Sequence, residues 1–177
     1  SENEQLFPTG NLSDEFDIPG IGLTTVTMIN AGIPTIFLPA EALSYTGTEL
    51  QEDINSKPAE LEKLEHIRAR ASVAMGITSE IGESKKLQHI PKLAFLSAPQ
   101  DYVSSSGKTI KGEDVNLLVR AMSMGKLHHA MMGTAAVAIG AAAAIPGTVV
   151  NKVSRIDSQE RSIVFGHPSG TLRVGAD

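Results

Sequence analysis

The spacing of apolar and polar residues predicts two adjacent strands near the start of the chain. In the segment 23–29, Thr24, Val26 and Met28 alternate with neighbours of mixed character, and an apolar segment, 35–38, follows it. A period of two is typical of strands. Asn30, Gly32 and Pro34 separate the two segments. We therefore expect two strands joined by a tight turn, in which the Asn30 amide could either bind a substrate or bridge backbone groups.

Spacings of three and four residues predict helices in the next part of the chain. Thr48 and Gln51 have the spacing of a capping box, so a short helix should begin there. A longer amphipathic helix is predicted for 58–75, ending at Gly76. Its apolar positions are Leu61, Leu64, Ile67, Ala71 and Ala74.

The second half of the chain alternates short apolar segments with polar ones. We expect a buried strand over 92–97, a loop over 100–112, and strands over 162–165 and 171–174. The segment 114–124 has helical propensity as well as strand-like alternation, so its residues alone leave both structures open.

An apolar segment of small residues is the most unusual feature of the sequence. From Ala135 to Ile145 nearly every residue is Ala, Val, Ile or Gly, and Pro146 and Gly147 end the run. A helix with no polar face is typically buried, and this one is too short to span a membrane. We expect a sheet to enclose it, because Ala and Gly allow backbones to approach closely.

Composition and charge exclude several classes of function. The net charge of −5 and an aromatic content of 4% argue against nucleic-acid binding, which relies on cationic surfaces and stacking platforms. The absence of cysteine excludes disulfides, thiolate metal sites and a cysteine nucleophile within this chain. With no segment that could cross a bilayer and a polar first segment, we expect a cytoplasmic protein without membrane contact.

The segment 166–170 combines two glycines, a histidine and a serine between two predicted strands. Consecutive backbone N–H groups in such a turn can bind an anion, and the hydroxyl groups of Ser169 and Thr171 could add donors. A carboxylate would fit this site. The alternative is a hairpin turn without a ligand.

The start of the small-residue helix is a second candidate anion site. Thr134, after Gly133, is predicted to be the N-cap, so the free N–H groups and the positive end of the helix dipole would face the space beyond it. In the alternative, Thr134 only satisfies the donors of its own helix.

Other chemistry is poorly supported by the residues. His128 and His129 would point to opposite faces of a strand and have no acidic partner at ligand spacing, so no metal site is expected. Lys126 and His167 could transfer protons if they are buried beside a substrate. Ser169 lacks the helix that follows a hydrolase nucleophile, so a hydrolase is rejected.

Five segments, spread over the whole chain, resemble the PrpF family of 2-methylaconitate cis-trans isomerases. They are 7–11 (FPTGN), 28–37 (MINAGIPTIF), 45–50 (YTGTEL), 123–134 (SMGKLHHAMMGT) and 165–174 (FGHPSGTLRV). The resemblance implies an α+β, diaminopimelate epimerase-like domain, in which a curled, mixed or antiparallel, barrel-like sheet surrounds a central buried apolar helix. It also favours the strand over the helix for 114–124.

The resemblance also implies a domain organisation. Residues 1–177 correspond to one domain, the C-terminal half of a two-domain isomerase whose active site lies between the halves. The chain would then be a fragment. The catalytic Lys and Cys of the family belong to the N-terminal half, so this chain alone should have no catalytic residue and no activity.

The implied reaction is the cofactor-independent isomerisation of an unsaturated di- or tricarboxylate, by removal and return of a proton. The resemblance implies 2-methylaconitate, in the methylcitrate route of propionate breakdown, with methylitaconate or oxalomesaconate as alternatives. The competing hypothesis is a non-catalytic carboxylate-binding or oligomerisation module. A homo-oligomer that rebuilds the cleft would need Lys126 and His167 as acid and base.

Taken together, the residues and the resemblance predict a site for the carboxylate groups of a substrate, with neither metal nor coenzyme. The predicted substrate-binding residues are Gly166, His167, Pro168, Ser169, Gly170, Thr171, Met132, Gly133, Thr134 and Asn30.

Overall fold

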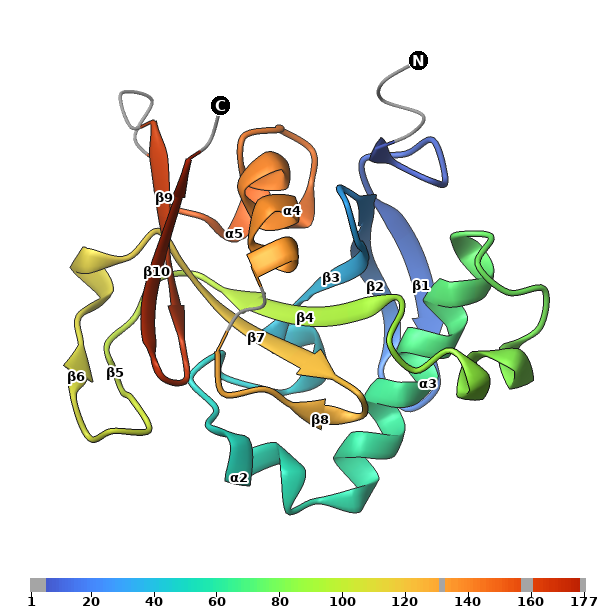
Figure 1. Ribbon diagram of the computed structural model, residues 1–177, viewed down its shortest axis with the longest axis horizontal. Helices are drawn as coiled ribbons and strands as arrows, with labels where there is room; N and C mark the ends of the chain where they lie inside the picture. The colour runs from blue at the N-terminus through green and yellow to red at the C-terminus, as the bar shows by residue number, and fades with distance from the viewer. Residues whose placement is uncertain (1–5, 131–132, 157–160, 176–177) are drawn as a thin grey trace.

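The computed structural model shows a mixed sheet with helices on both faces (Figure 1). The structure describes residues 6–130, 133–156 and 161–175. The strands are β1 (Asp14–Ile18), β2 (Gly22–Asn30), β3 (Pro34–Pro39), β4 (Lys92–Ser97), β5 (Tyr102–Val103), β6 (Thr109–Ile110), β7 (Leu117–Ser123), β8 (Lys126–Leu127), β9 (Ser162–His167) and β10 (Gly170–Gly175). The α-helices are α2 (Gln51–Asn55), α3 (Pro58–Ala74), α4 (Gly133–Ala143) and α5 (Val149–Val153). Short 3-10 helices occupy Ala40–Leu43, Ile81–Lys86 and Gly112–Asp114.

The main sheet has the order β1-β2-β3-β4-β7-β9-β10, with β8 beside β7. The pairs β3–β4 and β7–β9 are parallel, and the other neighbours are antiparallel. Strands β1 and β10 form its two edges within the described residues, so the sheet is open. The expected α+β class and mixed sheet are confirmed, whereas the barrel-like closure is not found.

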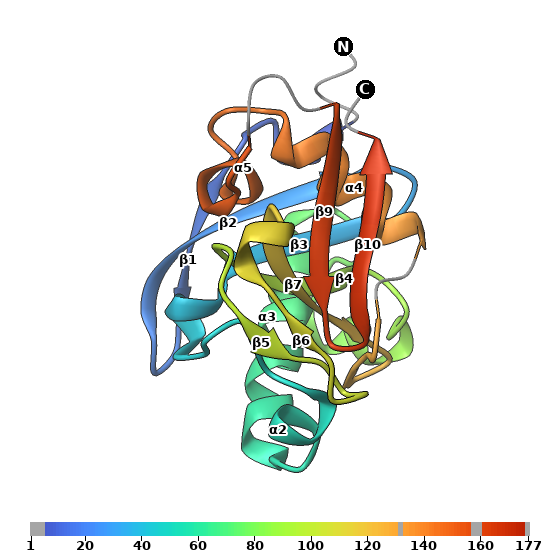
Figure 2. The same ribbon diagram turned by 90° about the vertical axis from the view of Figure 1, so that its left-hand side faces the viewer.

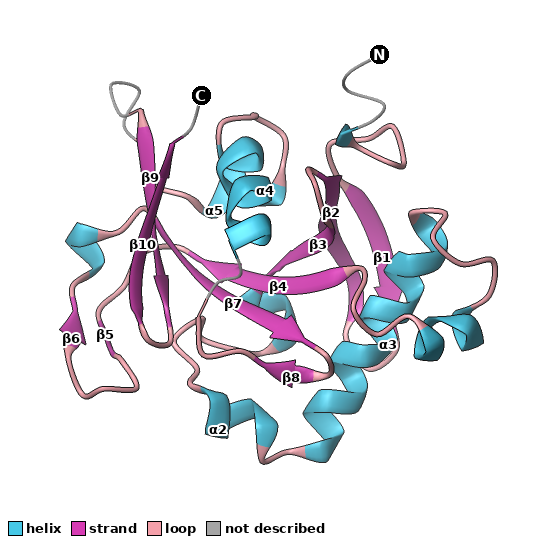
Figure 3. Ribbon diagram, in the orientation of Figure 1, coloured by secondary structure: helices cyan, strands magenta, loops and turns pink. Residues whose placement is uncertain are grey.

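Successive side chains of the central strands belong alternately to two separate hydrophobic cores. In β3, Ile36 and Leu38 belong to the core under α3, and Phe37 between them belongs to the core under α4. In β4, Leu93 and Phe95 likewise face the α3 side. Neighbouring side chains of a strand point to opposite faces, so a continuous apolar run is the pattern of a strand covered on both sides. Figure 3 shows the resulting three layers, with α4 and α5 on one face and α2 and α3 on the other.

The small-residue helix is confirmed as α4, and most of it is buried. Ala138, Ile139 and Ala142 have no exposed surface and pack in one core with β2, β4, β7 and β9. Gly140 lies against β10, where an added Cβ would come within 3.2 Å of Val174 Cγ2. The expectation of enclosure on every side is wrong, because Val137 is 60% exposed.

The predicted strands and the long helix are confirmed, and most differences concern short elements. The strand alternative for 114–124 is correct, as β7. The short helix starts at Gln51 rather than Thr48, because the Thr48 amide bonds to the Thr46 hydroxyl and the Asp53 carboxylate accepts from the Leu50 amide. The predicted loop 100–112 contains the small hairpin β5–β6.

Three elements of the main fold have no counterpart in the sequence predictions. These are β1, β8 and α5. Helix α5 begins at Val149 after a single capping residue, Thr148, whose hydroxyl accepts from the Asn151 amide at 3.1 Å. A helix of five residues is too short for its apolar period to be recognised.

Candidate functional site

The predicted anion-binding loop is a two-residue turn of the β9–β10 hairpin. Strand β9 continues to His167 and β10 begins at Gly170, so only Pro168 and Ser169 lie outside the strands. The pair Gly170–His167 closes the hairpin, and the chain then continues in antiparallel register. The predicted five-residue loop 166–170 is too long, because Gly166 and Gly170 belong to the strands rather than to the turn. Figure 2 shows the two strands side by side with this turn at their lower end.

Carbonyl groups around this turn accept hydrogen bonds from the body of the domain. The Tyr102 hydroxyl lies 2.7 Å from the His167 carbonyl oxygen and 2.9 Å from that of Gly170. The Ser105 amide donates to the Pro168 carbonyl at 2.8 Å. The carbonyl of Gly166, at the end of β9, accepts from Arg120 Nη1 at 3.1 Å. The turn is therefore held by the side chains of Tyr102 and Arg120 and by the Ser105 backbone, none of which the sequence analysis singled out.

His167 is buried, being 8% exposed, and its ring orders the turn itself. The Ser169 amide donates to His167 Nδ1 at 3.2 Å, so Nδ1 is the unprotonated ring nitrogen of the neutral form. Burial, and then the positive charge of Arg120, lower the pKa of His167 below its usual value. At neutral pH we therefore treat His167 as a neutral, structural imidazole.

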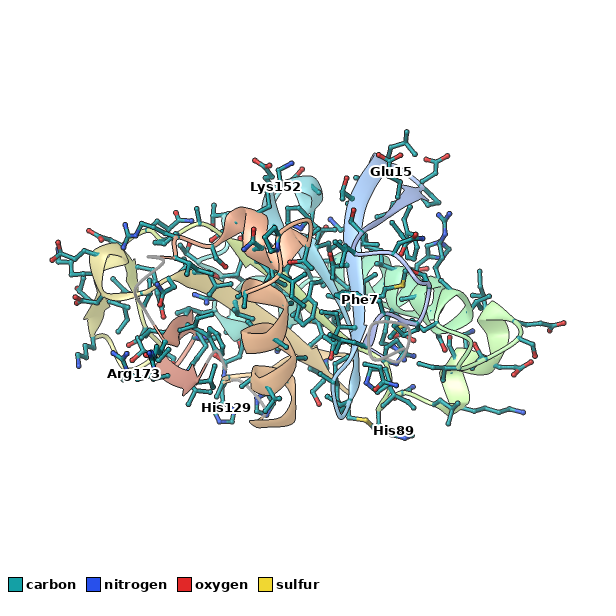
Figure 4. The ribbon with its side chains drawn as sticks, turned by 90° about the horizontal axis from the view of Figure 1, so that it is seen from above. Phe7, Glu15, His89, His129, Lys152 and Arg173 are labelled. Carbon is teal, nitrogen blue, oxygen red and sulfur yellow. The ribbon has the colours of Figure 1, made fainter. Side chains whose placement is uncertain are left out.

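The turn lies beside the segment that leads into α4. The Ser169 hydroxyl donates to the His129 carbonyl, and α4 begins four residues later at Gly133. Figure 4 labels His129, which lies between the β9–β10 hairpin and α4. The structure thus brings the turn to the segment that precedes α4, 40 residues away in the sequence.

The two neighbouring histidines do not lie on opposite faces of a strand, contrary to the sequence prediction. His128 and His129 follow β8 rather than lying in a strand, and their ring centroids are 4.4 Å apart instead of on opposite faces. In the described ranges, no three side chains of His, Asp or Glu are grouped as metal ligands would be. The backbone carbonyl of His129 accepts from the Ser169 hydroxyl of the candidate anion site.

The remaining predicted residues fall in different surroundings. Thr134 lies inside the first turn of α4 rather than before it, so it is not the N-cap. Met132 and the side chain of Thr134 lie outside the part of the chain that the structure describes. Asn30 is exposed at the end of β2, opposite Pro34, and β3, β4 and β7 separate β2 from β9 in the sheet. Lys126 is exposed on β8, so it lacks the burial expected of a proton-transfer group.

The exposed hydroxyl-bearing residues of the turn are the ones that a ligand could reach. Ser169 and Thr171 are both exposed, whereas Pro168 is buried. Arg120 and His129 provide the electrostatic surroundings of His167, together with backbone groups. An arrangement of hydroxyl groups, imidazoles and a nearby guanidinium favours an anion over a cation.

Sequence reasoning missed Arg120 and Tyr102, although a signal for one of them was present. Arg120 is a charged residue inside the otherwise apolar strand β7, and a charge in that position is rarely buried without a specific role. Tyr102 gave no such signal, because its hairpin was predicted to be a loop.

Comparisons with known proteins agree on the relationship. A sequence model of the PrpF protein family matches residues 1–177. A 2-methyl-aconitate isomerase of Shewanella oneidensis is 63% identical over 97% of this chain and 43% of its own length, and that of Cupriavidus necator is 56% identical with the same coverage. The crystal structure of a methylitaconate-delta-isomerase matches with a TM-score of 0.92 at 40% identity, covering 96% of this chain and 44% of its own.

The chain spans less than half the length of these relatives. Among the helices in the described residues, none has the length and apolar character needed to cross a membrane.

Proposed function

This chain belongs to the PrpF family, and on that premise we propose that it forms the substrate-binding, C-terminal half of an isomerase of unsaturated tricarboxylates. More than half of its residues are identical in two relatives named 2-methyl-aconitate isomerase, which supports 2-methylaconitate as the substrate. A relative from Eubacterium barkeri named 3-methylitaconate isomerase makes methylitaconate the first alternative.

The observation that carries this proposal is the bracing of the β9–β10 turn. Its carbonyl groups are turned toward Tyr102, Ser105 and Arg120. The two turn residues offer no free N–H group, because Pro168 has none and the Ser169 amide donates to His167 Nδ1 at 3.2 Å, so the proposal relies on the side chains that this bracing holds in place. The Ser169 hydroxyl is exposed in the turn but donates to the His129 carbonyl, and the exposed Thr171 hydroxyl at the start of β10 is the donor that a carboxylate could reach. We assign the binding of a substrate carboxylate to this turn and the start of α4.

In the proposed reaction this chain binds and orients, and the other half of the protein transfers the proton. The chain contains no cysteine, and the acid and base implied by the family resemblance are a Lys and a Cys of the N-terminal half. Donors that are fixed in place before the reaction stabilise the negative charge that develops when a proton is removed beside a carboxylate. His167 does not serve as the base in this scheme, because its Nδ1 is engaged by the Ser169 amide.

The test compares this chain with the protein in the length of its relatives. We expect ultraviolet absorbance to report isomerisation of 2-methylaconitate by the longer protein and none by residues 1–177. Isothermal titration should nevertheless show that residues 1–177 bind the substrate weakly, because closure of the cleft normally supplies much of the affinity.

Two variants locate the binding. Ser169→Ala should weaken binding, and Ser106→Ala, in the exposed β5–β6 loop, serves as a control. Isomerisation by residues 1–177 alone would contradict the division of labour. Binding by the chain with no activity in the longer protein would favour the non-catalytic carboxylate-binding module.

A further inference from the structure

Arg120 is a fully buried cation that makes no ion pair through its hydrogen bonds. It has no exposed surface. Its Nε donates to the Glu49 carbonyl at 2.5 Å, and Nη1 donates to the carbonyls of Val119 at 3.0 Å and Gly166 at 3.1 Å. Within the described part of the chain, Nη2 has no hydrogen-bond partner. All acceptors are therefore neutral carbonyl groups.

The Glu49 carboxylate acts on Arg120 through its charge, which favours the protonated guanidinium, while its oxygens are hydrogen-bonded to backbone amides. The two carboxylate oxygens of Glu49 accept from the amides of Thr46 and Gly47, both at 2.8 Å. Burial lowers the pKa of Arg120 to about 10, so the guanidinium remains charged at neutral pH. A buried charge that is only partly compensated is costly for stability, which calls for a role other than stabilising the fold.

Arg120 and Tyr102 act on the turn as one unit. The guanidinium carbon lies 4.8 Å from the centroid of the Tyr102 ring. The Tyr102 hydroxyl reaches the carbonyls of His167 and Gly170, and Arg120 itself reaches that of Gly166. Three carbonyl groups at the end of the hairpin are thus held by this stacked pair.

We infer that Arg120, with Tyr102, is a positioning residue for the carboxylate-binding turn, and that its buried positive charge strengthens anion binding there without contacting the ligand. This inference rests on the proposed function and names the residues that prepare its site. The hydrogen bonds fix the orientation of the turn, and with it the positions of the exposed Ser169 and Thr171 side chains. The positive charge of Arg120 also attracts an anion bound at the turn, since Coulombic interactions are stronger through the protein interior than through water.

The charge of Arg120 should also act on the ring of His167, which lies in the same hairpin. Arg120 lowers the pKa of His167, second only to the effect of burial. The other groups that act on His167 are the backbone of Thr171 and the ring and backbone of His129. A field that disfavours a proton on His167 favours an anion beside the same turn.

Four variants of residues 1–177 separate charge from geometry. Arg120→Met removes both the charge and the hydrogen bonds, whereas Arg120→Lys keeps the charge and loses the planar fork. Tyr102→Phe keeps the ring and removes the hydroxyl. The matched control is Arg70→Met, because Arg70 also lies over an aromatic ring, that of Phe16, and donates to a carbonyl, but on the α3 side of the sheet.

Two measurements are made on each variant. NMR titration of the ligand-free chain gives the pKa of His167, and calorimetric titration with 2-methylaconitate gives the dissociation constant. For Arg120→Met we expect the pKa of His167 to rise and the dissociation constant to increase roughly tenfold or more, which corresponds to a loss of about 1.4 kcal/mol. Arg120→Lys should restore the low pKa. Tyr102→Phe should weaken binding with the pKa nearly unchanged, and Arg70→Met should change neither quantity.

The outcomes distinguish the inference from the proposed function. If wild type binds and a folded Arg120→Met chain keeps the same affinity and the same pKa of His167, the inference is wrong and the proposed function stands. If wild type does not bind 2-methylaconitate, the proposed function fails, and the inference fails with it. Should Arg120→Met not fold, unchanged affinity in both Arg120→Lys and Tyr102→Phe would overturn the inference.

Discussion

At the scale of single residues, the site depends on side chains that fit against glycine. An added Cβ at Gly166 would come within 2.6 Å of Leu118 Cδ2 and 2.8 Å of the Tyr102 hydroxyl oxygen. Its φ is not in the left-handed region, so glycine is needed here for close approach and not for conformation. The absence of a side chain at 166 lets Tyr102 reach the carbonyls of the turn. Gly166 is therefore needed for close packing against Tyr102, and not for the positive φ of a turn that the sequence predicted.

His167 makes stability depend on pH at this scale. The folded chain keeps His167 neutral to a lower pH than the unfolded chain does, because burial and Arg120 lower its pKa. The unfolded chain therefore binds more protons as the pH falls below about 6.5, and the free energy of unfolding decreases there, by at most about 1.4 kcal/mol per pH unit. We expect His167→Asn to show a flatter dependence in urea unfolding between pH 7 and pH 5. Parallel curves for the two proteins would exclude this contribution.

At the scale of elements, α5 is fixed by one buried hydroxyl group. Thr27 Oγ1, in β2, donates to the Leu12 carbonyl at 2.8 Å and accepts from the Val149 amide at 2.9 Å. It thereby ties the N-terminal segment and the first residue of α5 to the same strand. A helix of five residues has little stability of its own, so such tertiary contacts determine its place.

Replacing this hydroxyl tests the role. Thr27→Val would leave the Val149 amide and the Leu12 carbonyl without their partner, and we expect a loss of about 1–3 kcal/mol in the free energy of unfolding. Thr25→Val is the matched control, because Thr25 lies in the same strand with its side chain exposed. Urea denaturation followed by circular dichroism measures both. Equal stabilities would mean that water replaces the Thr27 hydroxyl at no cost.

At the scale of the whole molecule, α4 leaves an apolar strip uncovered. Val137 is 60% exposed, Ala141 is partly exposed on the same side of the helix, and Ala144 just beyond the helix is exposed. Exposed apolar surface of this kind commonly marks a contact with another protein segment. In the proposed two-domain protein, the N-terminal half is a candidate to cover it.

Self-association of the isolated chain follows from this strip. We expect sedimentation velocity to show concentration-dependent association of residues 1–177, and Val137→Gln to reduce it without lowering the free energy of unfolding. Val103→Gln is the control, because Val103 is similarly exposed, at 56%, but belongs to the β5–β6 hairpin. An equal reduction by both variants would indicate general solubility rather than a specific contact at α4.

Local sequence patterns were sufficient for most of the elements that bury apolar surface. The strands β2, β3, β4, β9 and β10 and the helices α3 and α4 follow from apolar period, glycine and proline, because these signals act over a few neighbouring residues. The short elements β1, β8 and α5 could not be predicted, since their place depends on partners distant in sequence. The family was also evident from the sequence, because five motifs in order leave few alternatives.

The sequence by itself determined the family, the absence of a cysteine nucleophile in this chain, and the segment that carries the candidate carboxylate site. Only the tertiary structure decided that His167 is buried and bonded to the Ser169 amide, and that Arg120 and Tyr102 hold the turn. The physical reason is the distance along the sequence between the residues that interact. Periodicity and composition describe which side chains leave water, whereas the direction of a carbonyl group and the charge behind it are set by residues 46 to 68 positions away, which no local pattern contains.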